Sequence, residues 1–130
     1  MLNLYWLPSI NAAIELDKGN SSQALMFLET ATTYELQPGA LHSAYLRGEA
    51  YLQAHNGIAA AAEFQKVLDH RGIVLNLVTG ALAHLQLGRA YTMAGDTAKA
   101  KSAYQDFLAL WKDADIPILK EAKGEYAKLQ

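Results

Sequence analysis

Cysteine is absent from this chain of 130 residues. Disulfide bonds, thiolate nucleophiles and cysteine-ligated metal sites are therefore excluded. Proline is scarce, with three residues in the whole chain, so few positions break a helix. No apolar run approaches the roughly 20 residues that cross a bilayer, and we expect no direct membrane insertion.

An excess of basic residues is also lacking. The chain holds 11 Lys and Arg against 13 Asp and Glu, for a net charge of −2. Nucleic acids and anionic membrane surfaces select proteins with a basic face, so we expect neither as the main partner. Hydrophobic residues make up 52% of the chain, which is enough to bury the core of a single domain. The apolar N-terminus is not preceded by basic residues and is not predicted to be a signal peptide.

Motifs for catalysis or metal binding are missing too. The four histidines (His42, His55, His70 and His84) never stand three or four residues apart, the spacing that puts two ligands on one helix face. Serine does not occur in a G-x-S-x-G turn, and the carboxylates of Glu49 and Glu63 are predicted to point from different helix faces. We therefore predict no catalytic residue, no metal site and no cofactor, and a protein that is not an enzyme.

What the chain does contain is a repeated spacing of small and large residues. Gly88 is followed by Tyr91 after three residues, by Ala100 after twelve and by Tyr104 after sixteen. Small residues at Gly88 and Ala100 let two antiparallel helices approach closely, and the aromatic rings fill the space around their crossing. Gly95 and the residue after it suit a turn between the helices. The same offsets occur forty residues earlier, at Gly48, Tyr51, Ala60 and Phe64.

This pattern resembles the tetratricopeptide repeat (TPR), W-x2-L-G-x2-Y…A-x3-F, with His84 in the Trp place and Tyr104 in the Phe place. The resemblance implies an all-α α-solenoid of about three helix-turn-helix pairs and a C-terminal capping helix, about seven helices in all. The repeats are expected at about residues 4–36, 41–71 and 81–112, and the cap at 115–129. The first repeat is degenerate, since Ala12 fills its glycine place and Glu15 its aromatic place.

Three local predictions accompany this reading. Pro8 is expected in the first turn of a helix over 4–18, where its missing N–H is harmless. The turn of the second pair is placed at Asn56-Gly57. Because Gly48 and Gly88 are forty residues apart and the ordinary period is about 34, roughly six residues are inserted at 72–80. This insertion is either an apolar connector against the core or an extra turn of a neighbouring helix.

A narrower resemblance covers residues 44–129. Strings such as AYLRGEAYL, DHRGIVLN and AKGEYAKLQ are similar to the C-terminal TPR region of bacterial serine/threonine protein kinases of the acidobacterial type. The resemblance implies a fragment of a larger multidomain protein that serves as the docking or sensory region in signal transduction. The kinase motifs G-x-G-x-x-G, H-R-D-L-x-x-x-N and D-F-G are missing from the chain. We expect a cytoplasmic location, or a periplasmic one if a membrane-anchored kinase segment precedes it.

The TPR resemblance implies that the first helix of each pair lines a concave face that binds a protein or peptide. Arg89 there could pair with an acidic group of the partner, or Glu49 and Arg89 could pair with neighbours and leave the face without a ligand. The predicted peptide-binding residues are Tyr45, Glu49, Leu52, Gln53, Leu82, Leu85, Arg89 and Thr92.

The N-terminal edge is a second candidate surface. Tyr5, Trp6 and Leu7 would pack on a preceding repeat if one were present. Without it, such an apolar patch favours a homo-oligomer. The alternative function is therefore a self-association or spacer module with no external ligand.

Overall fold

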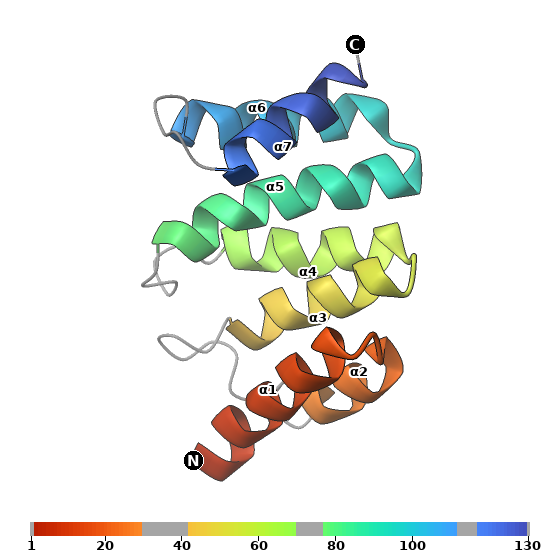
Figure 1. The fold of residues 1–130 in the computed structure, drawn as a ribbon, viewed down its shortest axis with the longest axis vertical. Helices are drawn as coiled ribbons and strands as arrows, with labels where there is room; N and C mark the ends of the chain where they lie inside the picture. The colour runs from red at the N-terminus through yellow and green to blue at the C-terminus, as the bar shows by residue number, and fades with distance from the viewer. Residues whose placement is uncertain (1, 30–41, 70–76, 112–116, 130) are drawn as a thin grey trace.

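The computed structural model describes residues 2–29, 42–69, 77–111 and 117–129. Over these ranges the chain is helical, which confirms the predicted all-α helical-repeat fold. The described helices are α1 (Leu2–Asp17), α2 (Ser21–Glu29), α3 (His42–Gln53), α4 (Gly57–Asp69), α5 (Leu77–Ala94), α6 (Thr97–Trp111) and α7 (Pro117–Ala127). They stack in chain order along the long axis of the molecule, with the two ends of the chain at opposite ends of the stack (Figure 1).

Each helix packs on the next one along the chain, which makes three hairpins and a final helix. In addition α1 packs on α3, and α3 packs on α5. The first helices of the hairpins therefore form one layer, and α2, α4 and α6 form a second layer behind it. This arrangement gives the stack an inner side, made by the first helices, and an outer side.

The buried side chains form three clusters along the stack. The N-terminal cluster joins α1, α2 and α3, and consists of Ala12, Leu16, Ala24, Leu28, Leu46 and Ala50. The central cluster joins α3 to α6, and consists of Ala44, Tyr45, Ala60, Ala61, Phe64, Val67, Leu68, Ala83, Leu87, Ala90 and Ala103. The C-terminal cluster joins α5, α6 and α7, and consists of Leu85, Ala100, Tyr104, Phe107, Leu119 and Ala122.

The glycines of the repeated spacing stand where two helices touch. A Cβ atom at Gly48 would lie 2.5 Å from the ring of Phe64, and a Cβ at Gly88 would lie 2.9 Å from the ring of Tyr104. Real Cβ atoms do not approach other atoms so closely, so only glycine fits under each ring. The offset of sixteen residues between each glycine and its ring therefore has a direct physical cause.

The three hairpin turns share one backbone geometry. Gly19, His55 and Gly95 each have a positive φ, of 81°, 59° and 84°. In each turn this residue donates its N–H to the carbonyl of the residue three positions before it. The residue that follows donates its N–H to the carbonyl five positions before its own. This is the bonding that closes the C-terminus of a helix. The turn of the second hairpin thus centres on His55 rather than on the predicted Asn56-Gly57.

Gly57 is instead the first residue of α4, and its role is close approach. A Cβ there would lie 2.6 Å from the carbonyl oxygen of Ala90 on α5. Asn56 precedes the helix and accepts a hydrogen bond from the N–H of Ala59 at 3.1 Å, as Asp96 does from Lys99 at 3.2 Å. Both residues are N-caps.

The turn geometry makes a stability prediction at His55. A left-handed conformation costs a side-chain-bearing residue about 1–2 kcal/mol, and glycine avoids most of it. We expect His55→Gly to raise the free energy of unfolding by about 1 kcal/mol, measured by urea denaturation. The control is Gly95→Ala, where a Cβ would meet nothing within 4 Å but φ is positive. Gly95→Ala should lower the free energy of unfolding by about as much. A more stable Gly95→Ala variant, or a less stable His55→Gly variant, would contradict the idea that the positive φ sets the stability of these turns.

Other local predictions are corrected by the helix bounds. α1 begins at Leu2, so Pro8 lies inside the helix rather than in its first turn. α1 therefore lacks one main-chain hydrogen bond at the buried Pro8.

Part of the predicted insertion at 72–80 is helical. Residues 77–80 form the first turn of α5, so this part of the insertion is an extra turn of a neighbouring helix. Residues 72–76 of the insertion, and residues 115 and 116 of the predicted capping helix, fall outside the described ranges. In α7, Leu119 and Ala122 are buried in the C-terminal cluster, and Ile118 and Tyr126 pack against it.

Candidate functional site

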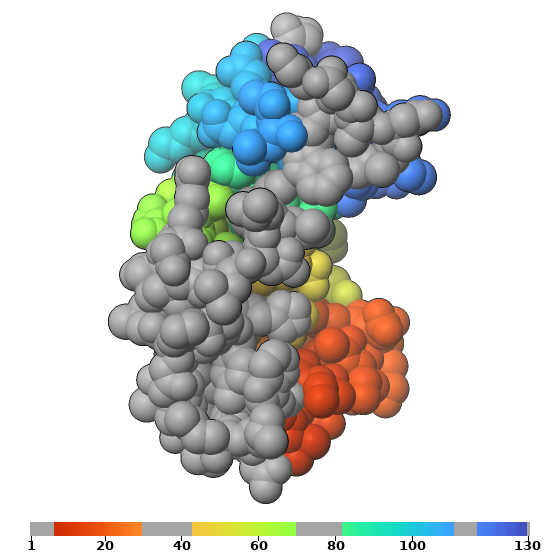
Figure 2. Space-filling view, turned by 90° about the vertical axis from the view of Figure 1, so that its left-hand side faces the viewer, coloured from red at the N-terminus to blue at the C-terminus, as the bar shows by residue number. Residues whose placement is uncertain are grey.

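The inner side of the stack is hollowed. In Figure 2 the profile of the molecule recedes over α3, drawn in yellow, between the red N-terminal helices and the blue C-terminal helix. We call the exposed and half-buried side chains on this side the inner wall. Its members come from α1, α3 and α5: Glu49, Gln86 and Arg89, which are joined by hydrogen bonds, Asp17, whose charge acts on Glu49, and the exposed Gln53 and Thr92 on the same helices.

Two of the predicted binding residues are not available at this surface. Leu85 is fully buried in the C-terminal cluster. Tyr45 is buried in the central cluster, where its ring stands edge-on to Phe64 with the centroids 5.4 Å apart. The prediction that these side chains line a peptide groove is wrong, because both point between the helices. Burial also raises the pKa of the Tyr45 hydroxyl to about 12, so this group stays protonated.

Four more of the predicted residues lie at or near the surface. Leu52 and Leu82 are half-buried and pack against the core clusters. Gln53 and Thr92 are exposed, but both hydrogen-bond to the main chain. The Gln53 amide donates to the carbonyl of Leu16 at 2.7 Å, which ties α3 to α1, and the Thr92 hydroxyl donates to the carbonyl of Gly88 at 2.9 Å.

Gln86 stands at the centre of the inner wall. Its amide nitrogen lies 3.5 Å from a carboxylate oxygen of Glu49 and 3.5 Å from the hydroxyl oxygen of Tyr45. Its amide oxygen accepts a hydrogen bond from the Arg89 guanidinium at 3.2 Å. One neutral amide therefore connects α3 to the charged group on α5.

Arg89 is held by the carboxylates of α7. Its Nη2 and Nε donate to Glu125 at 2.8 and 3.0 Å, and its Nη2 also reaches Glu121 at 3.5 Å. The hydroxyl of Tyr104 donates to Glu125 at 2.7 Å. Burial alone would raise the pKa of Glu125, but the bonds from Arg89 and Tyr104 outweigh it and lower the pKa. Arg89 is thus paired with neighbours in the chain, which was one of the two alternatives for this residue.

Glu49 differs from Arg89 because its partner is neutral. Burial raises the pKa of its carboxyl group, the Gln86 bond opposes this, and the negative charge of Asp17 adds to it. Within the described ranges no lysine or arginine pairs with Glu49; its hydrogen bond is the long one to Gln86. A half-buried carboxylate without a cation is under-compensated, so a positive group placed here would be stabilised.

The sequence prediction missed four members of this network: Gln86, Tyr104, Glu121 and Glu125. Two signals could have pointed to them. Gln86 stands three residues before Arg89 on one helix face, and Glu121 and Glu125 are four residues apart on the expected capping helix.

The described residues hold neither a metal-binding cluster nor a membrane-spanning helix. No group of three His, Asp or Glu side chains there could hold a metal ion. None of the described helices is both long and apolar enough to cross a membrane. His84, which stands at the Trp position of the repeat pattern, is buried, and its Nδ1 lies 3.9 Å from a carboxylate oxygen of Asp106.

The fold and the inner wall define a class of protein, an all-α array of helical hairpins with a hollowed inner side. Comparison with family models, with curated proteins and with solved structures found no match to this chain.

Proposed function

We propose that the chain is a non-catalytic protein-interaction module, a tetratricopeptide-repeat scaffold that binds a peptide on its inner wall. The observation that carries this proposal is Glu49, a half-buried carboxylate in the hollow whose hydrogen bond is to a neutral amide. A lysine, an arginine or a free amino group of a peptide would supply the missing positive charge. Gln53, one turn beyond Glu49 on α3, and Thr92, three residues beyond Arg89 on α5, are exposed and offer further polar contacts to the peptide.

Residues 44–129 resemble the repeat regions of bacterial serine/threonine kinases. This resemblance supports the proposal that the module is the docking or sensory arm of a bacterial signalling protein. Partner choice then rests on the inner wall, and catalysis rests on another part of the parent protein.

The test uses peptides selected from a random displayed library on the immobilised domain. We expect Glu49→Lys to raise the Kd of the selected peptides at least about tenfold, because the new lysine would repel the positive group of the peptide that Glu49 attracts. Glu29→Lys is the matched control, since it makes the same change on α2 in the outer layer, where Glu29 is exposed. Equal affinity for the wild type and both variants would place binding elsewhere and contradict the proposal.

A second candidate, self-association, is favoured by an apolar stripe on α1. Leu7, Ile10 and Ile14 are 51%, 53% and 46% exposed and lie on one side of the helix. The side chains of Tyr5 and Trp6, which belong to the predicted edge, are outside the described set. Sedimentation velocity at several concentrations distinguishes the two functions. A dimer that Ile10→Glu abolishes, in a domain that selects no peptide, would favour self-association over peptide binding.

A further inference from the structure

The apolar stripe on α1 occupies positions that are covered in the other two hairpins. Leu7, Ile10 and Ile14 are 51%, 53% and 46% exposed. Since Ala12, Gly48 and Gly88 stand in the same place of the three hairpins, the positions that match the stripe can be read from the sequence. All of them except the half-buried Gln86 are buried: Ser43, Leu46 and Ala50 on α3, and Ala83 and Ala90 on α5.

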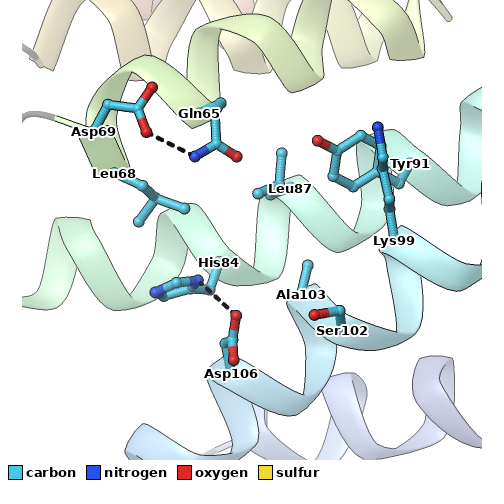
Figure 3. A pocket seen from close by; sticks show the side chains of 10 residues that line it. All are labelled: Gln65, Leu68, Asp69, His84, Leu87, Tyr91, Lys99, Ser102, Ala103 and Asp106. Carbon is cyan, nitrogen blue, oxygen red and sulfur yellow. Dashed lines mark hydrogen bonds and ion pairs between the residues drawn. The ribbon is translucent and has the colours of Figure 1, made fainter.

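The first helices of the second and third hairpins have a neighbour on each side. The buried Arg47 of α3 donates to the carbonyl of Leu28 on α2 at 3.5 Å and to Glu63 on α4 at 3.1 Å. In the same way α5 lies between α4 and α6 (Figure 3). At the stripe positions the cover is the second helix of the preceding hairpin, because Leu46 and Ala50 share a cluster with Leu28. The stripe on α1 is therefore a surface on which another helix fits.

The covering helix has a defined direction. Consecutive helices of the stack run in opposite directions, so α2 is antiparallel to α3, and α4 is antiparallel to α5 (Figure 1). A twofold axis that crosses α1 near Ile10 places the α1 of a second copy antiparallel to the first. The second copy then meets the stripe in the direction that α2 has on α3, and a single contact covers the stripes of both copies.

The size of the stripe side chains distinguishes such a pair from a further hairpin of the same kind. α4 approaches α5 so closely that a Cβ at Gly57 would lie 2.6 Å from the carbonyl oxygen of Ala90. Ile14 stands in the place of Ala90, where the second hairpin also has an alanine, Ala50. An isoleucine holds two helix backbones further apart than an alanine does, and it suits helices that interdigitate aliphatic side chains. The stripe therefore fits a helix with aliphatic side chains like its own.

The opposite end of the stack does not match the stripe. The side chains that α7 exposes are mostly charged, and include Lys120, Glu121, Lys123 and Lys128. Stacking α7 of one copy on α1 of the next would bury these charges against aliphatic side chains, which is costly. A twofold pair through α1 is therefore favoured over an end-to-end filament.

We propose that two copies of this chain pair through α1, antiparallel about a twofold axis near Ile10, with Leu7 of each copy next to Ile14 of the other. This inference rests on the self-association candidate and specifies its interface, and the inner wall takes no part in it. The contact covers three aliphatic side chains from each copy. An interface of this size gives a weak, reversible pair.

Cysteine cross-linking tests the arrangement, because the chain contains no cysteine of its own. Ile10→Cys places the two thiols beside the axis, and we expect a covalent dimer under mild oxidation. Two Leu7→Cys thiols would lie roughly 10 Å apart along the helices, too far for a disulfide. Leu7→Cys and Ile14→Cys should therefore cross-link when mixed but not alone. Met26→Cys, at a position that is 65% exposed on α2, is the control for random collision and should stay monomeric.

Sedimentation velocity measures the pairing without a cross-link. Ile10→Glu should raise the dimer Kd at least about a hundredfold, because it brings two carboxylates together in an apolar contact. Leu110→Glu makes the same kind of change on α6, at a position that is 62% exposed, and should leave the Kd unchanged. Both variants should keep the circular dichroism of the wild type, since each replaces a side chain that is already more than half exposed.

Three results would overturn the proposal. The wild type stays monomeric up to about 1 mM; Leu7→Cys alone cross-links as readily as Ile10→Cys, as in a parallel pair; or species larger than a dimer grow with concentration. Peptides selected on the inner wall should bind Ile10→Glu with wild-type affinity. A dimer that binds no peptide would count against the inner-wall proposal alone, so the two proposals fail in different ways.

Discussion

Replacing Phe64 with alanine is expected to lower the free energy of unfolding by about 3–5 kcal/mol. The ring is fully buried in the central cluster and stands edge-on to Tyr45. It also fills the space under Gly48, which has no side chain that could move into the vacated volume. When neighbouring side chains cannot move into a cavity, the cavity lowers the stability of the protein by its full amount.

Urea denaturation followed by circular dichroism measures this loss. The matched control is Phe27→Ala on α2, where the same ring is 36% exposed. It should cost less than about 1.5 kcal/mol, because an exposed ring gains little from burial in the first place. Equal losses at the two positions would mean that the ring of Phe64 does not hold α3 and α4 together.

Replacing Arg47 alone with leucine is expected to cost about 2–3 kcal/mol. Removing one partner of a buried ion pair costs about 3–5 kcal/mol, because the other charge stays buried without compensation. Here Lys66 remains 3.4 Å from Glu63, so part of the charge is still balanced and the expected loss is smaller. The carbonyl of Leu28 also loses a donor.

The double variant Arg47→Leu with Glu63→Ala should recover most of that loss. It copies the Leu87 and Ala103 pair that the chain itself uses one hairpin later. Exchanging a whole buried ion pair for apolar residues is often neutral, whereas breaking it is not. The measurement is a double-mutant cycle in urea. Additive losses from the two single changes would show that the two side chains are not coupled.

Much of the helical arrangement could be predicted from spacing alone. The offset between Gly48 and Phe64, and again between Gly88 and Tyr104, is set by a steric contact between two helices. Such a contact needs one small and one large residue at a fixed separation, and this is visible in a sequence. The turn at His55 could not be predicted in the same way, because the left-handed residue there is not a glycine.

The candidate site was less predictable for a geometric reason. A small error in the rotation assigned to a helix turns a surface residue into a core residue, as happened at Leu85. The partner of Arg89 comes from Glu125, 36 residues further along, and long side chains meet across a helix crossing at positions that no local pattern specifies. The sequence therefore indicates which helices form the wall better than it indicates which of their side chains are available.

The division of the core into three clusters has a consequence for how the molecule comes apart. Leu82 and Tyr91 pack against both the central and the C-terminal cluster, so α3 to α7 share one continuous interior. The N-terminal cluster has no such shared side chain among the described residues and meets the rest through α3. In a stack where each unit is stabilised by its neighbours, the weakest junction sets where cooperativity ends. The first hairpin is therefore expected to unfold before the rest, while the three-helix junction of Arg89, Tyr104 and Glu125 at the other end keeps the remaining helices folded as one unit.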